Sequence, residues 1–280
     1  MKFLDADPAS CSVLITGSGG KVIAPTIGAR FVQEVNAVAL AVEELHPDVG
    51  SAVELGGQDA KILIFQRDPL TGRSKKFTSM NDKCAGGTGA IIDKINAKLR
   101  VPADRLSQLG YDGIRLHQVA GKCGVFAETD INSLQKQGVP PQELMASLFE
   151  SIVQQNLSVL TRGNTLRPDV LLLGGPNTYI RGMVECWRHN ILRIWQERGL
   201  QLQDGRDVRD MIYVPDNAEY FAAIGTVIYA ERNEVHERFT GLDGLVDFIS
   251  HGRSAMRRSK VGKGLVDSAD ELARFRSRYS

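Results

Sequence analysis

Two of the four cysteines stand in the same unusual setting. Cys84 lies in "NDKCAGGTG" (residues 81–89), and Cys123 lies in "KCGVFAETD" (residues 122–130). Each follows a lysine and precedes small residues and a segment with helical periodicity. A cysteine beside a cation at the N-terminus of a helix is favoured as the thiolate, the form that binds metals. The pattern indicates metal or cluster ligation, with two reactive but unligated thiols as the alternative.

Two thiolates are too few for an iron–sulfur cubane, which takes four ligands, usually cysteines. A twofold dimer supplies four if each subunit contributes Cys84 and Cys123 and the cluster lies on the axis. The neighbouring glycines would then leave room for the cluster and for the partner's backbone. These glycines are residues 86, 87, 89 and 124.

The remaining cysteines lack this setting. Cys186 lies within a helical run beside Trp187, which is typical of core packing, and Cys11 lies in an irregular start. None of the four cysteines forms a C-x-x-C pair, which excludes a zinc ribbon and a thioredoxin-type motif.

Three glycine turns follow segments that resemble buried strands. They are "TGSGG" (residues 16–20), "LGGQD" (residues 55–59) and "LGGPN" (residues 173–177). Glycine allows positive φ and close backbone approach to a ligand, and backbone N–H groups in such turns can bind phosphate. Asp59 adds a carboxylate suited to Mg²⁺ or its waters. Together the turns indicate a phosphate-binding site.

Alternating strands and helices must position these turns. We expect strands at 12–17, 52–55, 60–65, 77–81, 169–175 and 211–215. We expect helices at 29–45, 89–99, 124–137, 141–160, 179–198 and 218–231. A strand, a tight turn and a strand around residues 55–59 predict an antiparallel pair, whereas a Rossmann unit would place a helix after the turn.

The composition and the hydrophobic pattern of the chain argue against several classes of protein. The chain has 280 residues, 42% of them hydrophobic, and a formal net charge of +1, which argues against nucleic-acid binding through bulk charge. The start has no apolar signal region and no stretch is long enough to span a membrane, so we expect a cytoplasmic protein with reduced thiols. Residues 251–264 are basic and resemble a linker, and residues 268–280 could form a short helix.

Five motifs in order resemble one family. They are "ELGGQDAKI", "NDKCAGGTG", "KCGVFAETD", "LLLGGPN" and "PDNAEYFAAIG". Over residues 12–231 the chain resembles the BadF/BadG/BcrA/BcrD-type ATPases, activators of 2-hydroxyacyl-CoA dehydratases and benzoyl-CoA reductases. The resemblance implies an α/β fold of the actin, Hsp70 and sugar-kinase class, with ribonuclease H-like lobes and ATP with Mg²⁺ between them.

The resemblance also implies a homodimer that shares one [4Fe-4S] cluster through Cys84 and Cys123 of each subunit. ATP hydrolysis would change the angle of the helices at the cluster and drive a low-potential electron into a partner dehydratase or reductase. Residues 56–59 would form the second phosphate loop, with Gln58 and Asp59 as its catalytic members. The residues implied in nucleotide binding are Gly56, Gly57, Gln58, Asp59, Gly174, Gly175 and Asn177.

Two features depart from the family pattern. Family members begin with an Asp-x-Gly-Ser/Thr turn, the first phosphate loop, and no such turn precedes Val13 here. We therefore expect an incomplete N-terminal lobe, an ATPase-type domain at residues 1–231 and a linker or tail at 232–280. The missing first phosphate loop, the additional residues 232–280 and Pro176 together favour a segment of a large multidomain activase.

Two alternatives remain open. The first is a small-molecule kinase of the same fold, in which Asp59 would be catalytic and the two cysteine motifs would have no explanation. The second is a non-catalytic, cluster-bearing or scaffolding module, which the missing first phosphate loop favours.

Overall fold

The structure, a computed structural model, describes residues 11–67, 74–81, 85–121, 123–200, 202, 205–252 and 268–279. By its internal contacts the chain divides into two compact units. The larger unit comprises Ile15–Ser18 and Val32–Glu234, and the smaller comprises Met1–Leu14, Gly19–Phe31 and Val235–Ser280. The domain boundary expected at residue 231 stays a prediction.

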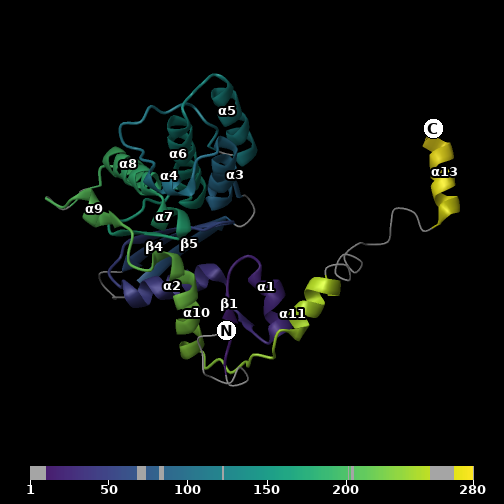
Figure 1. Cartoon of the computed structure of the whole chain (residues 1–280). Coiled ribbons are helices and arrows are strands. Elements are labelled where there is room, and N and C mark those ends of the chain that lie inside the picture. Colours follow the sequence, from purple (N-terminus) through teal and green to yellow (C-terminus); the bar gives the residue numbers. More distant parts are fainter. Residues whose placement is uncertain are drawn as a thin grey trace. The chain divides into compact units, whose positions relative to one another are not determined.

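A five-stranded sheet forms the centre of the larger unit (Figure 1). Its strands are β3 (Ser51–Leu55), β4 (Ala60–Arg67), β5 (Ser74–Asn81), β6 (Val170–Leu173) and β7 (Ile212–Tyr213). They stand in the order β5-β4-β3-β6-β7. β4 is antiparallel to β3 and β5, whereas β6 is parallel to β3 and β7. The antiparallel β3–β4 pair confirms the prediction made from the turn at residues 55–59.

Helices cover both faces of this sheet. The helices of the larger unit are α2 (Glu34–Leu45), α3 (Gly89–Leu99), α4 (Ala103–Gln108), α5 (Gly124–Lys136), α6 (Pro141–Leu160), α7 (Gly175–Tyr179), α8 (Arg181–Glu197), α9 (Val208–Met211) and α10 (Phe221–Arg232), with the single turns η3 (Ala85–Gly87) and η4 (Ala218–Tyr220). α2 and α10 pack together on one face, and α3, α6 and α8 lie on the other (Figure 1). Because strand side chains alternate, Ile62 and Ile64 join the core beneath α6, and Leu63 joins the core beneath α2.

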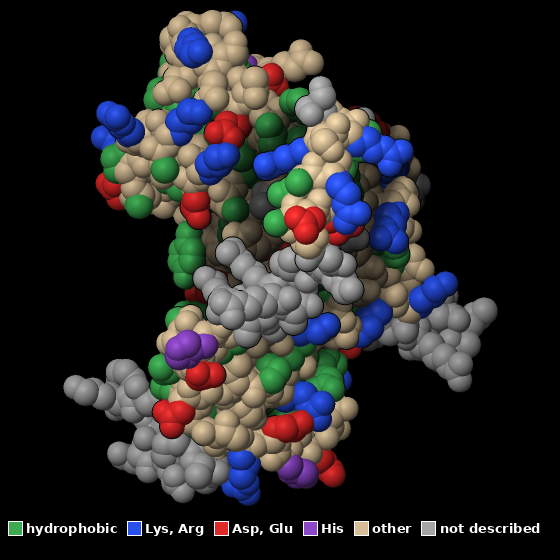
Figure 2. Space-filling model, turned by 90° about the vertical axis from the view of Figure 1, so that its right-hand side faces the viewer, with side chains coloured by type: hydrophobic (Ala, Val, Ile, Leu, Met, Phe, Trp, Pro, Cys, Tyr) green, Lys and Arg blue, Asp and Glu red, His purple; other side chains and the backbone are tan. Residues whose placement is uncertain are grey.

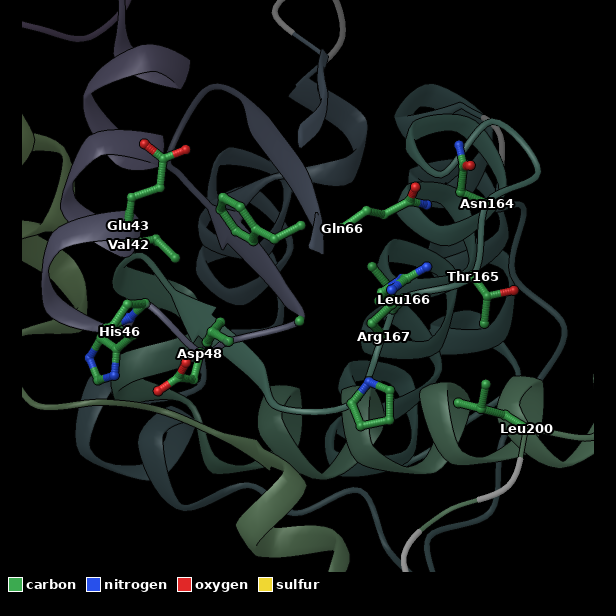
Figure 3. Close-up of a pocket in the computed structure, with 15 residues that line it drawn as sticks. Val42, Glu43, His46, Asp48, Gln66, Asn164, Thr165, Leu166, Arg167 and Leu200 are labelled. Atoms are coloured by element: carbon green, nitrogen blue, oxygen red, sulfur yellow. The ribbon is translucent and has the colours of Figure 1, made fainter. Parts of the chain in front are cut away.

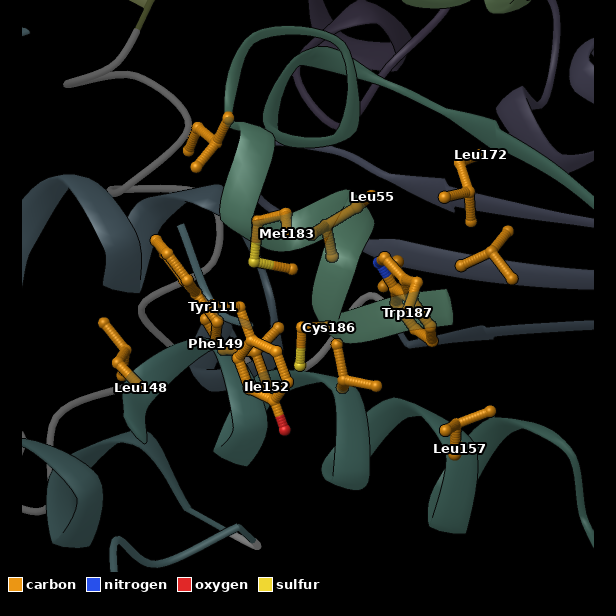
Figure 4. Close-up of a cluster of buried hydrophobic side chains, with 14 of the residues drawn as sticks. Leu55, Tyr111, Leu148, Phe149, Ile152, Leu157, Leu172, Met183, Cys186 and Trp187 are labelled. Atoms are coloured by element: carbon orange, nitrogen blue, oxygen red, sulfur yellow. The ribbon is translucent and has the colours of Figure 1, made fainter. Parts of the chain in front are cut away.

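Cys186 lies inside the apolar core between α6 and α8 (Figure 4). Its side chain is fully buried beside Trp187, and its Sγ lies 3.5 Å from Oε2 of Glu150. Burial raises the pKa of this thiol well above its usual value, and the Glu150 carboxylate adds to the effect. The thiolate is therefore disfavoured, and the packing role expected for Cys186 agrees with its position.

Several helix boundaries match the periodicity of the sequence. α3 and α6 have the expected bounds, and α6 begins after Pro140, with Pro141 as its first residue. The helix expected from residue 29 begins only at Glu34, because Arg30–Phe31 pair as strand β2 with β1 (Leu14–Ile15). The helix expected at 179–198 begins at Arg181, because the extended backbone at Ile180 separates it from α7.

Gly225 allows α10 to lie directly on α2. A Cβ atom at this position would lie 1.8 Å from the carbonyl oxygen of Ala37. Helix propensity alone predicts that Gly225→Ala stabilises the protein by about 0.5–1 kcal/mol. We expect the opposite sign, because overpacking of a close contact costs about 1–3 kcal/mol. Urea unfolding should show a lower midpoint for Gly225→Ala, and a higher midpoint would contradict the packing.

The smaller unit combines the first described residues with the segment that follows residue 234. Its elements are α1 (Gly20–Ile23), η2 (Ala24–Ile27), β2 (Arg30–Phe31), α11 (Asp243–Asp247), η5 (Phe248–Gly252) and α13 (Ala269–Tyr279). Thr240 N–H donates to the Ile27 carbonyl at 3.0 Å, and Phe239 N–H donates to the Cys11 carbonyl at 3.0 Å. α13 confirms the helix expected at the C-terminal end, whereas most of the basic stretch 251–264 lies outside the described residues.

The described surface carries mixed charge. Basic and acidic side chains are interspersed over the face seen in Figure 2, in keeping with the net charge of +1. Within the described ranges, no helix combines the length and the apolar character that crossing a bilayer requires.

Candidate functional site

The loop at residues 56–59 makes a tight turn between β3 and β4. Gly56 N–H donates to the Asp59 carbonyl oxygen at 2.9 Å, which closes the turn. A Cβ atom on Gly56 would lie 2.9 Å from Asp59 Oδ1, so the position needs glycine. Gly57 and Gln58 are exposed, whereas Asp59 is buried. The loop can therefore present backbone and the Gln58 amide to a ligand, with a carboxylate beneath them.

A second glycine turn, at residues 174–177, lies against the end of β3. Gly174 has a φ of 89°, and a Cβ there would lie 2.2 Å from the Leu55 carbonyl oxygen. Asn177 is fully buried; its Nδ2 donates to the Leu173 carbonyl, and its Oδ1 accepts from Trp187 Nε1. Because both groups of this amide bond within the fold, Asn177 holds the turn in place, and its contact with adenosine stays a prediction.

The N-terminus of α3 contacts both turns. Gly89 N–H donates to the Gly56 carbonyl, and Ala90 N–H donates to the Gly57 carbonyl, each at 2.9 Å. A Cβ on Gly89 would lie 3.1 Å from Pro176 Cγ of the second turn. The "GTG" sequence that follows Cys84 is therefore joined directly to the loop at residues 56–59.

A buried charged cluster lies beneath the two turns. Lys61 is fully buried, and its Nζ donates to Glu54 Oε2 at 2.5 Å and to Asp59 Oδ1 at 2.6 Å. The same Nζ lies 3.2 Å from Glu34 Oε1, and the Ser18 hydroxyl donates to Asp59 Oδ2 at 3.3 Å. Three carboxylates with oxygens within 4.8 Å of one another thus share one ammonium group. Mg²⁺ prefers oxygen ligands and is usually held by one or two carboxylates and several waters, so Asp59 at the edge of this cluster is the residue suited to it.

The excess of carboxylates changes how this cluster titrates. Burial raises the pKa of Glu54 to about 7, although Lys61 partly offsets the effect. Burial alone would lower the pKa of Lys61, but Glu54 and Glu34 raise it above its usual value, so Lys61 stays charged. Glu54 therefore changes its protonation state near neutral pH.

The turns that carry the two cysteine motifs meet within one subunit. A Cβ on Gly124 would lie 2.7 Å from the Cα of Gly86, so the two backbones touch. Cys123 is half-buried and is the N-cap residue of α5, as expected for a thiol at the start of a helix. Cys84 precedes Gly86 by two residues and lies outside the described residues, as do Lys83 and Lys122.

Buried polar side chains of α6 hold both turns. Asn156 Nδ2 donates to the Gly87 carbonyl at 2.8 Å, and Ser151 Oγ donates to the Ala120 carbonyl at 2.7 Å. Asp130 of α5 accepts from Ala120 N–H at 2.8 Å. One helix therefore fixes the spacing between the two motifs.

Comparison with known proteins identifies the family. Residues 1–186 match the family described as BadF/BadG/BcrA/BcrD ATPase. The chain belongs to this family. The resemblance stated from the five motifs is thereby confirmed at the family level.

This BadF/BadG-type chain has characterised relatives. It is 26% identical over 219 residues to the (R)-2-hydroxyglutaryl-CoA dehydratase activating ATPase of Acidaminococcus fermentans, covering 78% of this chain and 74% of the relative. It is 25% identical over 201 residues to the 2-hydroxyisocaproyl-CoA dehydratase activator of Clostridioides difficile, covering 72% and 67%.

A solved structure establishes the fold. The activator of the 2-hydroxyisocaproyl-CoA dehydratase from Clostridium difficile with bound ADPNP matches with a TM-score of 0.61 at 24% identity. The match covers 80% of this chain and 77% of that one. This BadF/BadG-type chain therefore has the actin-like ATPase fold, which confirms the expected fold class.

The charged residues beneath the loops were not among the residues singled out from the sequence. Glu54, Lys61 and Glu34 belong to segments that apolar periodicity assigns to a strand or a helix. A signal was present, because Lys61 and Glu54 are charged residues within otherwise apolar strands, and such residues are almost never fully buried without a partner. Ser151 and Asn156, polar residues within the amphipathic pattern of α6, carried a similar signal.

A separate groove of about 1020 Å³ lies at the other end of the sheet (Figure 3). His46 and Asp48 line one side of it, and Gln66 and Arg167 line the other. These residues lie near the start of β3 and the end of β4, whereas the glycine turns lie at the opposite ends of these strands. The groove is therefore separate from the two glycine turns.

The charged cluster predicts an unusual pH dependence. The stability that Glu54 contributes is fully present below about pH 4.5 and is lost as the pH rises through about 7, because its pKa is raised in the folded state. In metal-free buffer, the free energy of unfolding of Glu54→Gln minus that of wild type should therefore increase between about pH 5 and about pH 8.

The matched control is Glu128→Gln. A hydrogen bond from Lys94 lowers the pKa of Glu128, so its contribution changes only below its ordinary titration range. Chemical denaturation at several pH values measures both variants. Glu128→Gln should give a constant difference from wild type over this range, and parallel curves for Glu54→Gln would contradict the titration of Glu54.

Proposed function

We propose that this chain is an ATP-hydrolysing activator that carries a [4Fe-4S] cluster and serves a 2-hydroxyacyl-CoA dehydratase or benzoyl-CoA reductase-type partner. The observation that carries the proposal is the direct bonding of the α3 N-terminus to the loop at residues 56–59. The same helix follows the turn that touches Gly124. A nucleotide loop and the two cysteine turns would thus form one contiguous site.

The nucleotide half of the site uses the two glycine turns. Backbone N–H groups of Gly56 and Gly57 would bind phosphate oxygens, and Gly174 and Gly175 would border the adenosine. Asp59 would hold Mg²⁺ or its waters, and the exposed Gln58 would orient the attacking water.

The cysteine half of the site fits the chemistry of a cluster. Cys123 stands at a helix N-terminus, where negative charge is stabilised. The adjoining turns meet at Gly86 and Gly124, where a side chain would not fit, so these glycines allow the two turns to touch. Cys84 and Cys123 would be the ligands, whereas Cys186 is sealed in the core. When bound, the cluster would supply a one-electron centre of low potential for the partner enzyme.

A second copy of the chain would complete the ligand set. Val125 and Phe126 follow Cys123 in the first turn of α5, and they are 68% and 64% exposed. Large apolar side chains next to a metal-binding thiol are favoured when another protein surface covers them. A twofold dimer through this region would cover them and bring four thiolates to one cluster.

Anaerobic purification with iron, sulfide and ATPase analysis tests the proposal. We expect about two iron and about two sulfide ions per chain, because one cubane is shared by two subunits. We also expect Mg²⁺-dependent ATP hydrolysis. ATP-dependent phosphorylation of a small molecule by an iron-free protein would instead support a kinase. A bound cluster without nucleotide hydrolysis would support a non-catalytic module.

A further inference from the structure

We propose that the Thr88 hydroxyl is the positioning group that couples nucleotide binding at the loop of residues 56–59 to the cysteine-bearing turns. This inference rests on the proposed function, because it assigns a task to a residue between the two halves of that site. Thr88 itself is placed in contact with neither the nucleotide nor the cluster.

The bonding of the α3 N-terminus supports this role. Thr88 is fully buried, and its Oγ1 donates to the Gly57 carbonyl at 3.1 Å. The Gly57 carbonyl also accepts from Ala90 N–H, and the Gly56 carbonyl accepts from Gly89 N–H. The loop therefore receives three hydrogen bonds from three consecutive residues of one helix start, and displacement of the loop strains all three.

Thr88 also departs from the usual behaviour of a threonine in its position. It is the N-cap residue of α3, with extended backbone, yet its side chain does not cap its own helix. An N-cap threonine ordinarily accepts from the N–H of the second or third helical residue. Here the hydroxyl is directed to a different segment, so it contributes to a connection between elements instead of to helix α3.

The turn that precedes Thr88 is held from its other side. The Gly87 carbonyl accepts from Asn156 of α6 at 2.8 Å, and Gly86 touches Gly124 at the start of α5. Thr88 thus lies at the junction between a loop that would move with nucleotide and a turn anchored to two helices. Nucleotide binding can shift the turn only through a difference in its contacts between two states, and Thr88 makes such a contact.

The test compares Thr88→Val with Thr88→Ser and Thr161→Val. Valine keeps the shape of threonine and removes the donor, whereas serine keeps the donor. Thr161 is the matched control, because it is also buried but donates to the Leu157 carbonyl within its own helix. Thermal unfolding establishes that each variant is folded. Each is measured without nucleotide and with saturating, non-hydrolysable ATP analogue and Mg²⁺.

The readout that needs no cluster is the alkylation rate of Cys123 in cluster-free protein, assigned by peptide mass. We expect nucleotide to change this rate in wild type, Thr88→Ser and Thr161→Val. In Thr88→Val the nucleotide effect should shrink by about fivefold or more, the size of a typical coupling between sites. Amide hydrogen exchange of Gly89 and Ala90 should respond in parallel.

The outcomes separate this inference from the proposed function. A wild-type nucleotide effect that Thr88→Val retains in full overturns the role of Thr88, as does the absence of any nucleotide effect in wild type. Failure of the proposed function appears separately, as anaerobic protein without iron and sulfide.

Discussion

Gly124→Ala is expected to abolish or strongly reduce the proposed iron–sulfur cluster while leaving the protein folded. The added Cβ would lie 2.7 Å from the Gly86 Cα, so the two cysteine-bearing turns must separate. Overpacking of this kind costs about 1–3 kcal/mol. That cost corresponds to roughly a 5- to 150-fold loss of the arrangement that brings the turns together. Iron content and the visible absorption of anaerobic protein measure the loss.

Gly121→Ala is the matched control for this substitution. Gly121 precedes Cys123 in the same segment, but a Cβ there would lie no closer than 3.5 Å to a neighbour, at the Ser151 carbonyl. Cluster content should therefore stay near that of wild type. Equal cluster content in Gly124→Ala and Gly121→Ala would show that the Gly86–Gly124 contact does not position the ligands.

Lys61→Met should cause the largest loss of stability among single substitutions at the site. The change leaves the carboxylates of Glu54 and Asp59 buried together without their counter-ion. Removing one partner from a buried ion pair costs about 3–5 kcal/mol. Urea unfolding of nucleotide-free and metal-free protein should show this loss as a lower midpoint.

A double substitution tests the cause of that loss. Glu54→Gln removes one of the unpaired charges, so Lys61→Met with Glu54→Gln should recover part of the stability that Lys61→Met loses. The coupling between neighbouring buried groups is about 0.5–3 kcal/mol in such cycles. Additive losses in the double variant would show that the two side chains do not interact as the structure places them.

Individual strands and helices could be predicted from the sequence wherever the apolar residues followed one clear periodicity, that of a strand or that of a helix. The antiparallel strands around the turn at 55–59 and the helices α3 and α6 follow from alternation and from helical spacing. The pairing of β3 with β6 could not be predicted in this way. These strands are far apart along the chain, and periodicity carries no information about which distant strands are neighbours.

Some residues of the candidate site can likewise be recognised from the sequence, whereas others can be recognised only in the folded structure. The glycine turns and Cys123 are recognisable because the residue types themselves limit the chemistry. Lys61 was not predicted as a site residue, because the apolar pattern around it predicts only a strand and assigns no role to a single charged residue within it. Its role depends on Glu34, which comes from another element, and only the packed structure brings them within 3.2 Å.

We propose that Cys84 and Cys123 of two subunits hold one cluster. The most direct test is ultraviolet–visible and electron paramagnetic resonance spectra of anaerobically prepared wild type, Cys84→Ala and Cys123→Ala, with Cys11→Ala as the control. We expect either of the first two substitutions to abolish the cluster signals and to weaken the dimer, and Cys11→Ala to retain both. A full cluster in both Cys84→Ala and Cys123→Ala would contradict the claim.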